Sequence, residues 1–180
     1  MNKIIAIVGM CGSGKSVASE LLENLGYKKV YFGGVTIDKL KEKGLEVNPE
    51  NEKMMREKLR EDLGMGAFAK ILLPKIEEMA KTDNVVLDGL YSWDEYKILS
   101  DEFKNQLKTI AVVCDKNIRY DRLKIREIRP LTKKEADDRD LSEIENIAKA
   151  PPIAYADYFI FNNGTLDDYK KRLDEILEQI

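Results

Sequence analysis

Residues 9–16 read Gly9-Met10-Cys11-Gly12-Ser13-Gly14-Lys15-Ser16. A continuous apolar run at residues 4–8 precedes this stretch, and residues 17–22 follow it with the apolar spacing of a helix. A strand, a glycine-rich turn and a helix in this order are the context of a phosphate-binding P-loop. The stretch therefore predicts a site for nucleotide phosphates near the amino end of the chain.

The residue types of this loop suit an anion. Glycines at positions 9, 12 and 14 allow positive φ angles, so that the backbone can curl around a phosphate and point amides at it. Lys15 would neutralise phosphate oxygens, and the Ser16 hydroxyl would bind magnesium. Cys11 is read as a small loop residue, with a reactive thiol at a helix start as the alternative. The nucleotide-binding candidates here are Gly9, Cys11, Gly12, Ser13, Gly14, Lys15, Ser16 and Val17.

Composition limits the class of protein. The chain has 180 residues, of which 43% are hydrophobic and 35% are charged, which suits one domain with a sizeable core. The formal net charge of −3 gives no general signal for nucleic acid or membranes. Without any histidine, histidine acid–base chemistry is excluded, and two cysteines favour neither a zinc site nor a disulfide framework. The short apolar runs and the strand at the amino end predict a cytoplasmic enzyme.

Strand-like runs alternate with helical patterns along the chain. Strands are expected at residues 3–8, 27–32, 84–87, 109–114 and 157–161. Ser92, Thr132 and Thr165 are expected to cap helices, and Pro151-Pro152 to end the helix that Thr132 begins. The alternation predicts an α/β protein with a three-layer P-loop NTPase fold and a five-stranded parallel sheet. The segments 33–82 and 128–152 lack strands and are expected to be helical insertions over the carboxyl edge of the sheet.

Asp88 ends the strand at 84–87, where α/β sheets bind ligands, and suits the magnesium shell of a P-loop enzyme. The alternative is a turn aspartate before Gly89. A hydrolytic motor usually places a water-activating glutamate after this aspartate, and the base-reading motifs of GTPases are absent here. A basic run at 116–134, followed by Arg139, is read as cations aimed at the triphosphate, with a solvated helix face as the alternative. These features favour phosphoryl transfer to a second substrate under a lid.

The chain resembles the nucleoside monophosphate kinase superfamily along nearly its whole length, nearest its dephospho-CoA kinase and adenylate-kinase-like members. The resemblance rests on residues 85–89, on residues 113–126 and on the ending at residues 156–164. It implies that Arg122 or Arg126 lies by the ATP base and that Arg139 contacts the phosphates during transfer. It also implies that Asn162, Asn163 and Gly164 lie near adenine. The catalytic candidates are Lys15, Asp88, Arg126 and Arg139.

The acceptor side departs from the family pattern. Dephospho-CoA kinases carry an aspartate after the second strand, where this chain has residues 32–35, Phe-Gly-Gly-Val. The Pro-Arg that follows Asp-Gly in many nucleotide kinases is replaced by Tyr91-Ser92. A basic residue of the first insertion would then supply the missing cation. The acceptor-binding candidates are Gly34, Asp38, Arg56, Arg60, Gly89 and Tyr91.

The sequence thus predicts an ATP- and magnesium-dependent kinase acting on a nucleotide-like acceptor, either dephospho-CoA or a nucleoside monophosphate. The alternatives are a regulatory or partner-activated ATPase and a nucleotide-binding module without turnover. One domain, 1–180, would hold a core (1–32, 83–127 and 153–180), an acceptor-binding insertion (33–82) and a lid (128–152). The expected partner is a small molecule, without nucleic acid or membrane, for a monomer or a small homo-oligomer.

Overall fold

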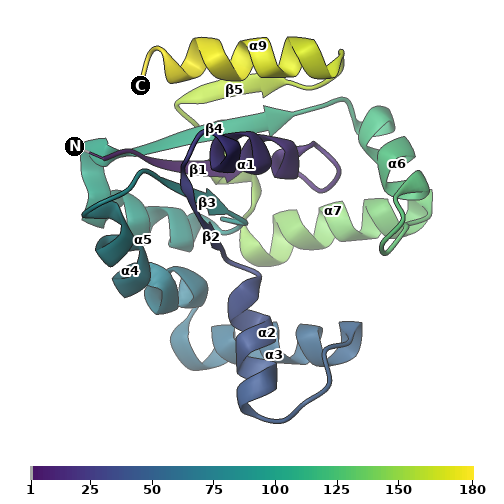
Figure 1. The fold of residues 1–180 in the computed structure, drawn as a ribbon. Helices are drawn as coiled ribbons and strands as arrows, with labels where there is room; N and C mark the ends of the chain where they lie inside the picture. The colour runs from purple at the N-terminus through teal and green to yellow at the C-terminus, as the bar shows by residue number, and fades with distance from the viewer. Residues whose placement is uncertain (1) are drawn as a thin grey trace.

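The computed structural model describes residues 2–180 and contains one parallel sheet (Figure 1). The strand order is β2-β3-β1-β4-β5, and every neighbouring pair is parallel. The strands are β1 (Ile4–Val8), β2 (Lys28–Tyr31), β3 (Val85–Asp88), β4 (Leu107–Val113) and β5 (Tyr158–Phe161). The predicted five-stranded parallel sheet is therefore confirmed.

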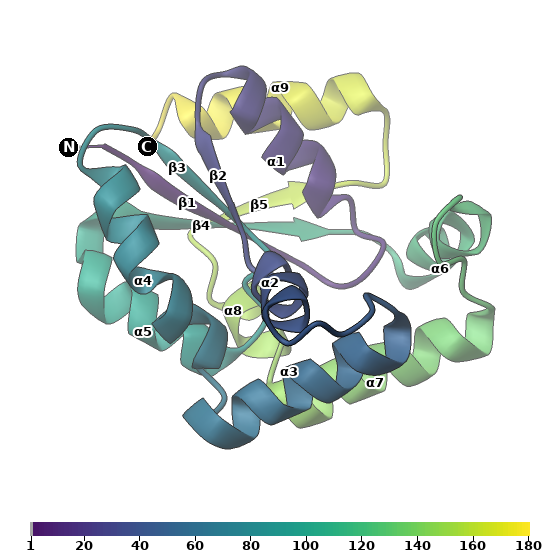
Figure 2. The same cartoon turned by 60° about the horizontal axis from the view of Figure 1, so that its bottom comes forward.

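Helices cover both faces of this sheet. The helices are α1 (Lys15–Asn24), α2 (Gly34–Glu42), α3 (Pro49–Leu63), α4 (Ala67–Ala80), α5 (Trp93–Phe103), α6 (Lys116–Ile125), α7 (Lys133–Ile147), α8 (Ala150–Ala154) and α9 (Leu166–Leu177), with a short 3-10 turn at Lys104–Gln106. Helices α1 and α9 lie on one face, and α4 and α5 lie on the other (Figures 1 and 2). The three-layer arrangement predicted from the alternation of strands and helices is thus present.

Strand β1 shows why the apolar runs are continuous. All five of its residues are buried, because it lies in the middle of the sheet with helices on both sides. Ile5 and Ile7 pack into the core under α1 and α9, whereas Ile4, Ala6 and Val8 pack into the core under α4 and α5. The chain leaves β1 directly into the glycine-rich loop, so this rigid strand positions the predicted phosphate site.

Segments 33–82 and 128–152 are helical, as their lack of strand patterns predicted. Helices α6 and α7 stand at the end of the sheet where the strands finish, and α2 and α3 extend away from the sheet (Figure 1). The division of these segments into an acceptor-binding part and a lid stays a prediction. No helix within residues 2–180 combines the length and the apolar character that crossing a bilayer requires.

The predicted end of the helix that Thr132 begins is wrong. Helix α7 ends at Ile147, where Ala148 adopts a left-handed conformation with φ +50°, and the two prolines do not end it. Instead Pro151 and Pro152 lie in the first turn of α8, a position that tolerates proline because its amide needs no helical partner. The predicted caps are confirmed, and Ser92, Thr132 and Thr165 each form a capping box with the residue three positions later.

Candidate functional site

The glycine-rich loop after β1 has a backbone that only glycine can adopt. The φ angles of Gly9, Gly12 and Gly14 are +150°, +79° and +101°. A Cβ on Gly9 would lie 2.4 Å from the Val112 carbonyl oxygen, and one on Gly14 would lie 2.3 Å from Nδ2 of Asn162. The loop is therefore a tightly packed turn, and its curvature is that of an anion-binding cradle.

Two polar groups of this loop fit a phosphate. The Ser13 side chain is completely buried, and its Oγ has no hydrogen-bond partner within residues 2–180. The Lys15 ammonium donates one hydrogen bond, at 2.9 Å, to the Met10 carbonyl oxygen. Burial lowers the pKa of Lys15 from 10.5 to about 7, and the positive charge of nearby Lys149 adds to the decrease. A phosphate at the loop would supply the opposite charge that Lys15 lacks.

Two of the residues predicted to lie near the ATP base, Arg122 and Asn162, meet beside the loop. Asn162, after β5, donates from Nδ2 to the Ser13 carbonyl oxygen at 2.7 Å. Arg122, on α6, donates to the Asn162 carbonyl oxygen at 3.0 Å. Asn163 fastens the next turn by accepting a hydrogen bond from the Asp115 amide at 2.9 Å. Of the two arginines proposed for the base side, Arg122 is the one in this position.

Arg126 is placed differently. Helix α6 ends at Ile125, so Arg126 follows the helix, and its Nε donates to the carbonyl oxygen of Arg129 in the same connection. It makes no hydrogen bond or ion pair to residues 9–16 within the described chain. Within residues 2–180 Arg126 therefore bonds to its own connection, and the catalytic role expected for it stays a prediction.

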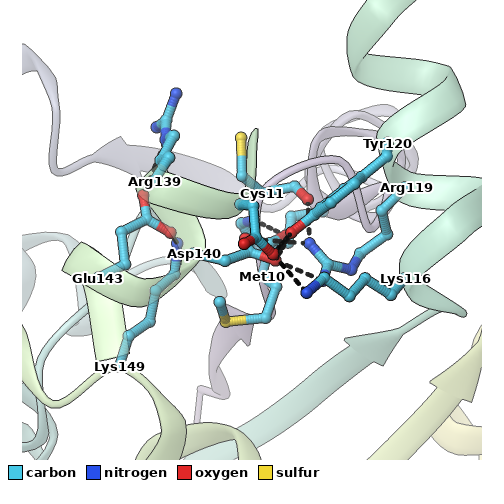
Figure 3. Close-up of polar contacts among 11 residues, drawn as sticks. Met10, Cys11, Lys116, Arg119, Tyr120, Arg139, Asp140, Glu143 and Lys149 are labelled. Atoms are coloured by element: carbon cyan, nitrogen blue, oxygen red, sulfur yellow. Dashed lines mark hydrogen bonds and ion pairs between the residues drawn. The ribbon is translucent and has the colours of Figure 1, made fainter. Parts of the chain in front are cut away.

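The arginine that reaches the loop is Arg119, which sequence reasoning did not select. Its guanidinium donates to the Cys11 carbonyl oxygen at 2.9 Å and binds both carboxylate oxygens of Asp140, on α7, at 2.6 and 3.1 Å (Figure 3). Both side chains of this ion pair are 8% exposed. The Tyr120 hydroxyl donates to Asp140 as well, at 3.2 Å. This buried network ties α6 and α7 to the backbone of the phosphate-binding loop.

Asp88 has the donor chemistry for magnesium. It ends β3 in register with Ile7, next to the strand that feeds the loop. Its carboxylate accepts no hydrogen bond within residues 2–180, and its nearest cation is the Lys29 ammonium at 3.8 Å. Burial raises the pKa of Asp88 above its ordinary 3.8. The exposed Ser16 hydroxyl is also free of hydrogen bonds within these residues, so both predicted ligands have oxygens to offer.

A second set of charges extends from α7 to α8. Arg139 donates from Nε to Oε1 of Glu143 at 3.0 Å, and the Lys149 ammonium binds Oε2 of the same carboxylate. Lys149 is 2% exposed, and its Nζ lies 4.4 Å from the ring centroid of Tyr91. Burial alone would raise the pKa of Glu143, but Lys149 and Arg139 outweigh it and lower the pKa. Neither Glu143 nor Lys149 was selected from the sequence.

The predicted acceptor cations lie on α3. Arg56 pairs with Glu52 at 3.4 Å, and Glu52 also binds Arg129 at 2.6 Å. Arg60 has no acidic partner within residues 2–180, its buried Nε lacks a hydrogen bond, and its guanidinium lies 5.2 Å from the Phe68 ring centroid. Burial lowers the pKa of Arg60 from its ordinary 12.5. Arg60 is therefore the cation of α3 that is available to an anionic ligand.

The remaining acceptor candidates divide into two groups. Gly89, with φ +100°, lies against the Tyr91 ring next to Asp88, so these residues form one wall beside the end of β3. Gly34 begins α2, and its neighbour Gly33 packs so closely under the Tyr31 ring that a Cβ there would lie 2.4 Å from it. Asp38, by contrast, is exposed on α2 and makes no hydrogen bond or ion pair within residues 2–180.

The chain matches one protein family and several curated relatives along most of its length. A family model described as "AAA domain" matches residues 5–145. A UPF0200 protein of Thermococcus onnurineus is 33% identical over 181 residues, which is 98% of this chain and 97% of that protein. A UPF0200 protein of Sulfurisphaera tokodaii is 35% identical over 184 residues, covering 99% of this chain and 97% of the relative.

Solved structures share the fold at low sequence identity. TT1252 from Thermus thermophilus superposes with a TM-score of 0.66 and 19% identity, covering 99% of this chain and 98% of that one. Shikimate kinase from Bacteroides thetaiotaomicron gives a TM-score of 0.62 with 16% identity, covering 98% and 97%. Shikimate kinase from Acinetobacter baumannii in complex with shikimate gives 0.59 with 18% identity, covering 99% and 95%. The fold is that of P-loop kinases, as the resemblance in the sequence indicated.

Proposed function

For this chain, which belongs to the AAA domain family and to the UPF0200 proteins, we propose the activity of an ATP-dependent small-molecule kinase. The reaction would transfer the γ-phosphoryl group of ATP to a small acceptor that carries an anionic group. A nucleotide-like acceptor, dephospho-CoA or a nucleoside monophosphate, is the first candidate. The observation that carries the proposal is the glycine cradle after β1, where the buried Ser13 hydroxyl has no hydrogen-bond partner and Lys15 has no acidic partner within residues 2–180.

On the nucleotide side, the loop amides and Lys15 would bind the β- and γ-phosphates, and Arg122 with Asn162 would border the base. Ser16 and Asp88 would hold magnesium, which supplies charge neutralisation for the phosphates when it is bound. Phosphoryl transfer depends mostly on positioning and on cations, so a site without histidine is adequate.

On the acceptor side, Arg60 would bind the anionic group, because its buried Nε has no partner of its own within the described residues. Tyr91 and Gly89 would form the wall next to Asp88. For a hydroxyl acceptor, Asp88 would take the proton, and burial raises its pKa in the direction that a base requires. A phosphate acceptor needs no such base.

The shikimate kinases of similar fold act on a small acceptor by their name, and one of them is seen in complex with shikimate. Their low identity transfers no substrate to this chain. They support only the coarser part of the proposal, a small-molecule acceptor next to a P-loop.

The test is an acceptor panel. Purified protein, ATP and magnesium are incubated with nucleoside monophosphates, dephospho-CoA and shikimate, while ADP release is followed. A kinase releases ADP only with one acceptor, whereas a partner-activated ATPase releases it without any, and a binding module binds ATP but releases none. Lys15→Ala should abolish release.

Arg60→Met tests the acceptor side of the site. This change should raise the KM for the acceptor at least about tenfold, because a hydrogen bond to a charged group contributes about 1.5–3 kcal/mol, and leave the KM for ATP within about twofold. Lys58→Met is the matched control, since Lys58 is exposed on the same helix and pairs with Asp62. An unchanged acceptor KM in Arg60→Met would remove Arg60 from the site.

A further inference from the structure

Three charged residues of α7 and of the connection to α8, Arg139, Glu143 and Lys149, contact one another in series. Lys149 binds Glu143, Glu143 binds Arg139, and Arg139 is followed in the chain by Asp140, whose partner Arg119 donates to the Cys11 carbonyl oxygen of the phosphate-binding loop. Figure 3 shows Arg139, Glu143 and Lys149 in a row along one side of the site, across from Arg119 and Asp140. Arg139, at one end of this row, is 42% exposed, and Lys149, at the other end, is 2% exposed. Lys149 is therefore the fixed end of the row, and Arg139 is the cation that a ligand can reach.

Glu143 accepts a hydrogen bond from Nε of Arg139, and neither terminal guanidinium nitrogen of Arg139 donates a hydrogen bond within residues 2–180. Arginine binds phosphate through two parallel N–H groups, which a free pair of terminal nitrogens can provide. Glu143 therefore orients Arg139 from behind and does not occupy the face that would bind a phosphate.

The anchor, Lys149, is held from three sides. Its ammonium binds Glu143, and its backbone amide donates to the Glu143 carbonyl oxygen at 3.2 Å. Its Nζ also lies over the Tyr91 ring, which packs against Gly89, the residue after Asp88. Lys149 thus touches both α7 and the loop that follows β3.

The backbone turns sharply at Ala148, which brings Lys149 back to the end of α7. Ala148 has φ +50°, a left-handed conformation that is uncommon for a residue with a Cβ, and it turns the chain so that Lys149 lies over the last turn of α7. A glycine would adopt this conformation without strain. The strain at Ala148 is therefore offset by the contacts that Lys149 makes.

We propose that Lys149 is a positioning residue that, through Glu143, holds Arg139 with its terminal nitrogens ready for the terminal phosphate of the nucleotide. The proposal rests on the proposed function, because it assigns Arg139 to the phosphoryl group that is transferred. Lys149 itself is covered by Glu143 and Tyr91 and acts without touching the nucleotide. Its contact with Tyr91 links this orientation to the loop beside Asp88.

The test is a double-mutant cycle on Lys149→Met and Arg139→Gln, read by calorimetry as the ratio of the Kd for ADP to the Kd for a non-hydrolysable ATP analogue, both with magnesium. Arg139→Gln should lower this preference about tenfold, since one lost charge-assisted contact has about that effect. Lys149→Met should lower it by a similar factor. The double variant should resemble Arg139→Gln alone, because both changes remove the same contact.

Glu143→Gln is the second variant, in case Lys149→Met fails to fold, since it keeps the shape of the side chain while it removes the charge. It should lower the preference as Arg139→Gln does. The exposed Glu145, on the same helix, gives the matched control Glu145→Gln, which should change nothing. Lys149→Arg, which retains the positive charge, should restore part of the preference.

The outcomes separate the two proposals. A loss of preference in Arg139→Gln without a loss in Lys149→Met or Glu143→Gln overturns the positioning role alone. Independent, multiplicative losses in the double variant also overturn it, because they show that Lys149 acts by another route. A wild-type protein that binds both nucleotides equally, unaffected by Arg139→Gln, overturns the transfer role of Arg139 and the positioning role with it.

Discussion

Nucleotide binding should take up a proton at Lys15. Burial and the neighbouring Lys149 lower the pKa of Lys15 to about 7 in the free protein, so at pH 8 about nine in ten of these side chains are neutral. A phosphate beside the ammonium favours the charged form and restores the proton. Binding at pH 8 should therefore take up about 0.9 proton per nucleotide, and binding at pH 6 about 0.1.

The affinity should follow the same titration. Below pH 7 the protonation of Lys15 costs nothing, whereas above pH 7 each pH unit costs about 1.4 kcal/mol, which is a tenfold loss of affinity. The stability of the free protein should change in the opposite sense. Between about pH 7 and 10.5 the unfolded chain holds a proton that the folded chain has lost, so the free energy of unfolding should rise with pH.

The assay is calorimetry with a non-hydrolysable ATP analogue and saturating magnesium at pH 8, in two buffers with different ionisation enthalpies. The difference in apparent binding enthalpy gives the number of protons taken up. At pH 8 the phosphates of the nucleotide are already ionised, since such groups titrate near about pH 6. Lys15→Arg is the control, because a guanidinium keeps its charge throughout this range.

Two results would contradict this reasoning about Lys15. An uptake below about 0.2 proton in the wild-type protein at pH 8 would mean that Lys15 is already charged before binding. An equal uptake in Lys15→Arg would mean that a different group titrates.

Two further changes probe the architecture around the loop. Arg119→Met should lower the free energy of unfolding, measured in urea, by about 3–5 kcal/mol, because it leaves the buried Asp140 carboxylate without its cation. Lys124→Met, at an exposed position of the same helix, is the control and should change the free energy of unfolding by less than about 0.5 kcal/mol. Equally small effects of the two changes would refute the role of the ion pair. Gly14→Ala should weaken ATP binding at least about tenfold while the fold is kept. The φ angle of Gly14 is +101°, and the new Cβ would lie 2.3 Å from Nδ2 of Asn162. Unchanged ATP binding would show that the loop tolerates the added Cβ.

The sheet and the phosphate loop could be predicted because their signals are local. The run from Ile4 to Val8 is apolar at every position, as a central parallel strand requires, and the glycines at 9, 12 and 14 carry the backbone geometry in their residue type. Asp88 was found by the same logic, since its place at the end of a strand determines where it lies in the fold.

The arginine that contacts the loop could not be chosen from the sequence. Arg119, Arg122 and Arg126 recur at the spacing of one helical face, and the resemblance selected only Arg122 and Arg126. The choice depends on where α6 crosses the loop and on where the helix stops. Because α6 ends at Ile125, Arg126 lies outside it and bonds to its own connection, while Arg119, one turn into the helix, reaches Cys11 across 108 positions of sequence.

Nothing in the sequence around Lys149 predicted its burial or its contact with Glu143. A lysine just before Ala150 and two prolines reads as an exposed residue at a helix end, and the prolines themselves were misread as the end of α7. Its burial follows from the left-handed turn at Ala148, a conformation that the residue type does not reveal. A contact that depends on one unusual dihedral angle lies outside what periodicity and capping rules can predict.

The ion pairs that hold the segment 128–152 to the rest of the protein include Arg119–Asp140 and Arg129–Glu52. These two differ in burial, and this difference indicates which of them breaks first when the segment moves away from the site. The Arg119–Asp140 pair is buried on both sides and joined to the loop backbone, whereas in the Arg129–Glu52 pair, which is also bidentate, the Arg129 side chain is 56% exposed and that of Glu52 is 11% exposed. Solvent at the exposed Arg129 guanidinium screens the Arg129–Glu52 pair more than the Arg119–Asp140 pair, so breaking it costs less free energy. We therefore expect the connection at Arg129 to part from α3 first, with α7 turning about Asp140. Arg139, adjacent to that pivot in the chain, would then move least, which suits a residue that must meet the phosphate in one orientation.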